Sequence, residues 1–104
     1  MAADDVADQI RALLDDAEPV DLTALERTLT DGYARALSLE AERWRIEKRI
    51  SEVARTLTGA DEKLKTKELA TLAKRLEASH LDLVALRGLL ASLRVRAGAA
   101  RPTA

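Results

Sequence analysis

The sequence predicts an all-α protein, built as a long antiparallel two-helix coiled-coil hairpin with a short N-terminal helix packed on its open end. The first observation is composition: Ala, Leu, Glu, Lys and Arg dominate, and Tyr33 and Trp44 are the only aromatic residues, as is typical of long helices. The second is a seam of apolar or small residues at every third or fourth position in two long stretches, the spacing of a coiled coil. The 104 residues fit one domain, residues 1–104.

The first element is a short amphipathic helix over residues 4–16, in which Val6, Ile10 and Leu13 recur at helical spacing. Pro19 ends it, because the residue before a proline avoids the helical region. We expect this helix to fold back over the start of the second helix and the end of the third. Its expected contact surface there consists of Gly88, Ala91 and Val95.

The second element is a helix over residues 21–57, with Asp21 or Thr23 as its N-cap. Thr23 has Glu26 three residues later, which is the spacing of a capping box. Gly32 lies inside the helix and costs about 1 kcal/mol relative to alanine. We expect this glycine to sit where another helix comes close.

The third element is a helix over residues 62–97, which follows a turn where Gly59 takes a left-handed conformation. The last residues, 98–104, are expected to fray. The seam of the two long helices consists of Leu22, Leu25, Leu29, Gly32, Ala36, Leu39, Arg43, Ile46, Ile50, Val53 and Leu57, and of Leu69, Leu72, Leu76, Ser79, Leu83, Leu86, Leu90, Leu93 and Ala97.

The seam also predicts a register. If the two long helices form an antiparallel hairpin, the seam positions face each other when the numbers of opposite residues sum to 122. This register pairs Gly32 with Leu90 and places the turn at residue 61. On one flank the same register sets Arg49 near Arg75 and Glu42 near Asp82, and such like charges do not reinforce it. Pairing of the long helices between two chains is the alternative.

A second apolar face lies beyond the reach of the short helix. Its members are Leu37, Ala41 and Trp44 on the second helix and Leu81 and Val84 on the third. Contiguous apolar surface of this kind usually marks a protein contact. We expect a homodimer that forms a four-helix bundle, with Trp44 as the anchor. A higher oligomer is an alternative assembly, and another helical protein is the alternative partner.

One group of residues has the chemistry of a metal site. Glu77 and His80 lie on one face of the third helix, and the register places Glu40 opposite His80. This Glu-x-x-His pattern resembles that of ferritin-like bundles, which implies an iron or manganese site completed at a dimer interface. A hydrogen bond or ion pair between Glu40 and His80 is the alternative, and Arg43 or Arg87 could neutralise the carboxylates instead.

Charge is distributed unevenly along the chain. Residues 1–31 contain nine acidic and two basic residues, whereas residues 32–104 contain fifteen basic and nine acidic ones. The acidic start is expected to dock on the basic remainder of the same molecule. Residues 43–76 contain ten basic and five acidic residues, so a hairpin that binds nucleic acid through its basic distal half is a further alternative. No aromatic residue interleaves these bases for stacking.

Little in the sequence indicates catalysis. It contains one histidine and no cysteine, and neither a nucleophile elbow nor a glycine-rich phosphate loop. The sequence therefore favours a non-enzymatic interaction or structural module without a cofactor. It shows no signal peptide and no apolar run of about 20 residues, so we expect a cytoplasmic protein that does not enter a membrane.

Overall fold

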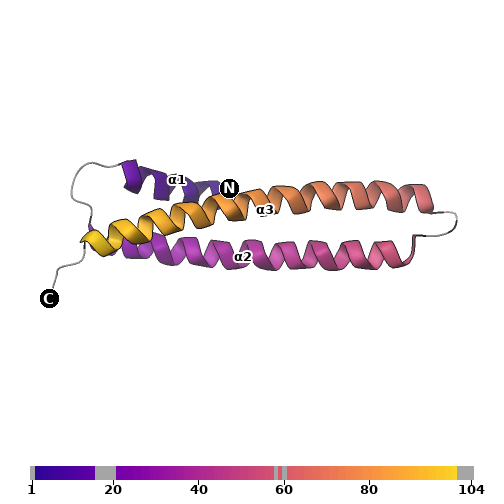
Figure 1. The fold of residues 1–104 in the computed structure, drawn as a ribbon, viewed down its shortest axis with the longest axis horizontal. Helices are drawn as coiled ribbons and strands as arrows, with labels where there is room; N and C mark the ends of the chain where they lie inside the picture. The colour runs from indigo at the N-terminus through magenta and orange to yellow at the C-terminus, as the bar shows by residue number, and fades with distance from the viewer. Residues whose placement is uncertain (1, 16–20, 58, 60, 101–104) are drawn as a thin grey trace. The chain divides into compact units, whose positions relative to one another are not determined.

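The computed structural model describes residues 2–15, 21–57, 59 and 61–100. These residues form the helices α1 (Ala2–Asp15), α2 (Leu22–Arg55) and α3 (Glu62–Ala100), and they contain no strand. Helices α2 and α3 pack together as an antiparallel helical hairpin (Figure 1). The predicted fold class, an all-α hairpin with a short N-terminal helix, is confirmed.

The hairpin divides into two compact units. The terminal unit consists of Met1–Leu37 and Val84–Ala104, and the turn unit consists of Ser38–Leu83. Both long helices contribute to both units, whereas α1 belongs to the terminal unit alone.

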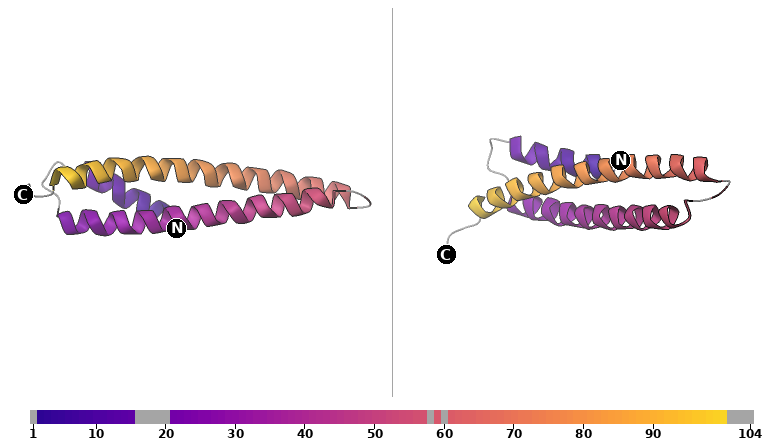
Figure 2. Two further views of the ribbon diagram at one scale, coloured as in Figure 1. Left: turned by 60° about the horizontal axis from the view of Figure 1, so that its bottom comes forward. Right: turned by 45° about the vertical axis from the view of Figure 1, so that its right-hand side comes forward.

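The terminal unit is built around α1, which lies beside the first part of α2 and the last part of α3 (Figures 1 and 2). Ile10 of α1 is fully buried, as are Leu25 of α2 and Leu93 of α3. A Cβ atom added to Gly32 would clash with Cδ2 of Leu90 and would lie 3.5 Å from Cδ1 of Ile10. The expected close approach at Gly32 is therefore confirmed, and it involves both neighbouring helices.

A hydrogen bond joins the end of α1 to α3. Nη1 of Arg96 donates to the carbonyl oxygen of Leu14 over 3.0 Å. Carbonyl groups in the last turn of a helix have no partner within the helix, and a cation there also interacts favourably with the helix dipole. Arg96 thus ties the last turn of α1 to the hairpin.

The prediction of which residues of α3 contact α1 is wrong. Val95, Ala91 and Gly88 are exposed, and no atom lies within 4 Å of a Cβ built on Gly88. The physical reason is that Gly32 has no side chain, so Ile10 of α1 can lie close to the seam at this point of α2. Helix α1 therefore packs next to Leu90 and not on the outer side of α3.

The turn unit has its own core cluster, formed by the buried residues Ile46, Val53 and Leu72, and Leu39 and Leu83 of this unit are buried as well. The half-buried residues Ile50, Leu69 and Leu76 pack against this core. These are the residues that the predicted register places opposite one another. Ser79 occupies a seam position and is buried, and its hydroxyl has no hydrogen-bond partner among the described residues.

The flank of the turn unit differs from the expectation that its charges oppose the register. Nη2 of Arg49 lies 2.8 Å from Oε1 of Glu68 on α3, and Nη1 lies 3.7 Å from Oε2 of Glu52 on α2. Arginine is long enough to reach a carboxylate more than one turn away from the residue level with it. Arg49 therefore links the two long helices, although the register sets it near Arg75.

Asp21 is the N-cap of α2. Its Oδ1 accepts a hydrogen bond of 3.0 Å from the backbone NH of Thr23, and its carbonyl accepts one of 3.1 Å from the NH of Leu25. Of the two expected caps, Asp21 is correct and Thr23 is not, since Thr23 lies inside the helix.

The turn is closed by backbone and side-chain hydrogen bonds. Gly59 has a φ of +90°, a left-handed conformation that is easy for glycine, and its carbonyl accepts a hydrogen bond of 3.3 Å from the NH of Glu62. Nζ of Lys65 donates to the carbonyl of Thr56. These two bonds link Gly59 and Thr56, which follow α2, to the start of α3.

The observed helix ends differ from the predicted ones by a few residues. Helix α2 ends at Arg55, before the predicted residue 57, whereas α3 continues to Ala100 past the predicted end at 97. Gly98 does not end α3, because a single glycine costs only about 1 kcal/mol in a helix. The predicted stop at Pro19, residue 16 and the tail from 101 to 104 lie outside the described residues.

Candidate functional site

The five residues of the predicted contact face are all solvent-exposed. In the turn unit, Trp44 is 61% and Leu81 is 59% exposed, and Ala41 is exposed as well. In the terminal unit, Leu37 is 67% and Val84 is 53% exposed. Large apolar side chains usually contribute to the interior of a small protein. These residues do not pack into the hairpin, so their apolar surface is available for a contact.

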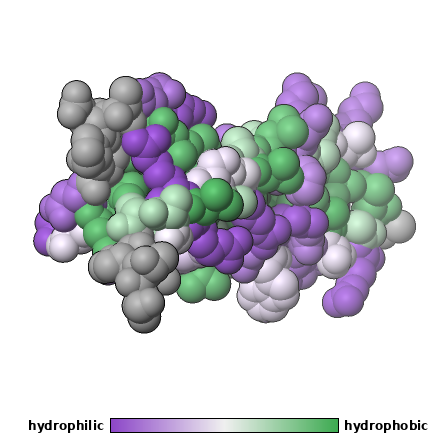
Figure 3. Space-filling model, turned by 60° about the vertical axis from the view of Figure 1, so that its left-hand side comes forward, coloured by the Kyte–Doolittle hydropathy of each residue, from purple (hydrophilic) through white to green (hydrophobic). Residues whose placement is uncertain are grey.

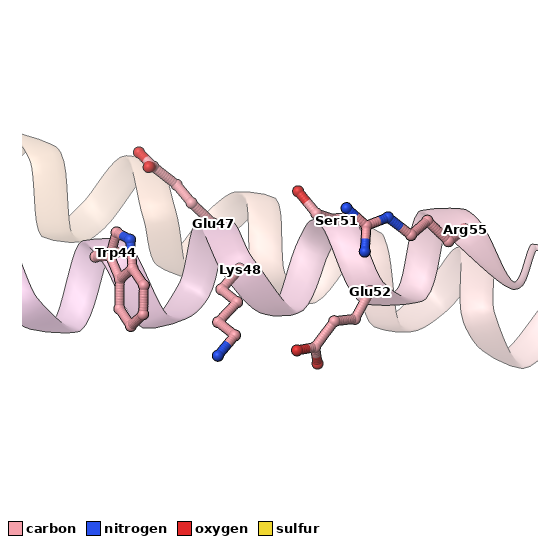
Figure 4. A pocket seen from close by; sticks show the side chains of 6 residues that line it. All are labelled: Trp44, Glu47, Lys48, Ser51, Glu52 and Arg55. Atoms are coloured by element: carbon pink, nitrogen blue, oxygen red, sulfur yellow. The ribbon is translucent and has the colours of Figure 1, made fainter.

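The surface around Trp44 is formed by one helix. A shallow hollow of about 400 Å³ lies along α2, and its lining residues are Trp44, Glu47, Lys48, Ser51, Glu52 and Arg55 (Figure 4). Nζ of Lys48 lies 5.2 Å from the centroid of the indole ring, within the range of a cation–π interaction. No residue of α3 lines the hollow, so it is an open furrow that can receive side chains but does not enclose a small molecule.

Apolar surface also reaches the solvent elsewhere. Leu64 in the turn unit and Val95 in the terminal unit are both exposed. Figure 3 shows that hydrophobic groups on the face in view are interrupted by hydrophilic side chains. Isolated exposed apolar residues are common in soluble proteins, so these two residues alone do not indicate a contact surface.

The three predicted metal ligands all lie in the turn unit, but the structure does not form a metal site from them. Among the described residues, no group of three or more His, Asp and Glu side chains is placed to hold a metal ion. Glu77 and His80 are exposed, and Glu40 is half-buried. A site completed by a second copy of the chain stays a prediction.

Arg43 contacts His80. Its Nη1 lies 3.5 Å from Nδ1 of His80, and its Nε donates to Oε1 of Glu47 over 3.1 Å. A guanidinium can only donate hydrogen bonds, so this contact uses Nδ1 of His80 as an acceptor. The positive charge also opposes the binding of a metal cation at that nitrogen.

A second feature of the turn unit was not predicted as a site. A groove of about 260 Å³ runs between α2 and α3 and is lined by Glu42, Arg45, Ile46, Arg49, Leu72 and Arg75. The register predicts that the like charges of Arg49 and Arg75 lie near each other, but it does not predict the groove between them. Its shape depends on how the two helices pack around Ile46 and Leu72.

No family model matches the chain, and neither a curated protein nor a solved structure shows significant similarity to it. Over the residues that the structure describes, no helix combines the length and the apolar character required to cross a membrane.

Proposed function

We propose that this chain is a non-enzymatic helical interaction module that associates with a second copy of itself through exposed apolar side chains of the hairpin. The observation that carries the proposal is the exposure of Trp44 and Leu81 in the turn unit. Leu37 and Val84 in the terminal unit give a second exposed apolar pair.

Trp44 is the expected centre of the contact. A large aromatic side chain buries much area when a partner covers it, and such residues dominate the energetics of many interfaces. The open furrow beside it, with the small Ser51 among larger neighbours, offers space for a side chain of the partner. A symmetric dimer is the simplest assembly in which each copy supplies both the side chain and the furrow.

The test is the mass of the protein in solution, measured by native mass spectrometry and by light scattering over a range of concentrations. We expect the unmodified chain to form a dimer, and Trp44→Ala combined with Leu81→Ala to shift it to the monomer. Leu64→Ala is the control, because Leu64 is a large apolar residue of the turn unit that is 69% exposed but lies outside the predicted contact face. We expect that variant to remain dimeric.

Two results would contradict the proposal. A monomer at every concentration would exclude self-association, and the exposed side chains would then be available to a different protein. A dimer that persists in the double variant would exclude this surface as the interface.

A further inference from the structure

The groove between α2 and α3 combines an apolar floor with a basic rim. Ile46 and Leu72, which belong to the buried core of the turn unit, form the floor. Arg45 and Arg49 line it from α2, and Arg75 lines it from α3. Glu42 is the only acidic side chain of the lining, so guanidinium groups outnumber carboxylates around a common space.

The arginines of the groove differ in their partners. Arg49 is held in place by Glu68 and Glu52. Arg45 and Arg75 are exposed, and neither forms a hydrogen bond or an ion pair with any residue that the structure describes. Two unpaired guanidiniums therefore border the groove from opposite helices, beside a third whose position is fixed.

Arg45 and Arg75 take no part in the ion pair by which Arg49 links the two helices. Like charges that line a common space repel each other, and a carboxylate in place of Arg45 or Arg75 would remove this repulsion. A bound anion would convert the repulsion between these arginines into attraction for a shared ligand.

The chemistry of the rim selects the class of anion. Guanidinium groups donate pairs of parallel hydrogen bonds, and this geometry fits phosphate oxygens. The volume of about 260 Å³ suits one or two phosphoryl groups. We propose that this groove binds a phosphate-bearing anion, with Arg45 and Arg75 as its clamp and Arg49 as a third donor. No member of the predicted contact face lines the groove, so the two proposed sites share no residue.

The first test uses sodium diphosphate as the probe, with sodium chloride of equal ionic strength as the reference. We expect low-millimolar diphosphate to raise the Tm of the protein by a few degrees over the reference, because a ligand that binds only the folded state stabilises it. Arg45→Gln and Arg75→Gln should lose most of this rise. Lys74→Gln removes a neighbouring exposed charge outside the groove and should retain it.

The same variants give a second readout that a general salt effect would not produce. Without diphosphate, Arg75→Gln should have a higher Tm than the unmodified chain, because it relieves the repulsion across the groove. A variant that is more stable but no longer responds to diphosphate would show that the arginines of the groove lower stability in the absence of the anion and bind it when it is present. An equal rise in chloride, or a full response in Arg75→Gln, would overturn the proposal.

Calorimetry then distinguishes the source of the phosphate. Direct binding of diphosphate that weakens at least tenfold in Arg75→Gln supports the site and indicates a small phosphorylated ligand. Binding of a short DNA duplex alone, lost in the same variant, supports the site and indicates the backbone of a nucleic acid. Binding of neither probe overturns the proposal.

Discussion

The glycines of this chain have different roles, and their surroundings separate these roles. Gly32 is buried, and a Cβ atom there would overlap the side chain of Leu90, which is itself buried. Gly88 also lies within a helix, but no atom lies within 4 Å of the position of its Cβ. The first glycine is required by packing, whereas the second only lowers the stability of α3.

This contrast predicts opposite effects of the same substitution. Gly32→Ala should lower the free energy of unfolding by about 1–3 kcal/mol, the usual cost of overpacking a core. Gly88→Ala should raise it by about 0.5–1 kcal/mol, since alanine favours the helix. Urea denaturation followed by circular dichroism, at one protein concentration, measures both. A stabilising Gly32→Ala would show that Leu90 can move aside freely.

At the same scale, the neighbours of His80 show what could not be predicted from the sequence. The register places Glu40 opposite His80, and the structure also places Nη1 of Arg43 at 3.5 Å from Nδ1 of His80. Backbone register limits which residues are near one another, but the long side chains of arginine and glutamate can reach several neighbours. Periodicity therefore could not show that Arg43 contacts the ring.

At the scale of the elements, the seam predicted most of the architecture. Every seam residue is buried or half-buried, including the polar Arg43 and Ser79, because the positions of a helix face depend on spacing and not on the residue type. The helix ends were less predictable, since they depend on individual hydrogen bonds. Thr23 and Asp21 were equivalent N-caps by residue type, and only the geometry assigns the cap to Asp21.

The N-cap gives a prediction for α2. Asp21→Ala should lower the free energy of unfolding by about 1 kcal/mol, because the NH of Thr23 loses its acceptor. Asp21→Asn should leave it nearly unchanged, since asparagine caps helices equally well. Thermal denaturation should show a Tm decrease of about 4–8 °C for the alanine variant. An equal loss of stability in Thr23→Ala would contradict the assignment of the N-cap to Asp21.

At the scale of the whole molecule, the two units differ in how their cores are built. The terminal unit contains three helical segments and fully buries Ile10, Leu25 and Leu93. The turn unit contains two segments; Leu83 is its one large side chain that is fully buried among the described residues, and three of the six residues in its core cluster are only partly buried. Local stability follows the number of buried apolar contacts, so the units are expected to open with different free energies.

Hydrogen exchange measures this difference directly. Backbone amides of residues 64–72 in the turn unit should exchange faster than those of residues 86–93 in the terminal unit, because fewer apolar groups must be exposed to open them. The Trp44→Ala, Leu81→Ala monomer is the suitable sample, since a partner would protect the turn unit. Uniform protection along both long helices would mean that the two units unfold together.

The position of the single tryptophan has a practical consequence. The chain has one Trp, at position 44, and its indole ring is exposed on the outer side of α2 beside Lys48. Because no other indole contributes, the ultraviolet fluorescence of the protein under selective excitation originates from this surface alone. The emission wavelength therefore reports how far Trp44 is exposed to water at the proposed contact, without a dye or a label. Dilution alone should shift it toward the emission of a hydrated indole.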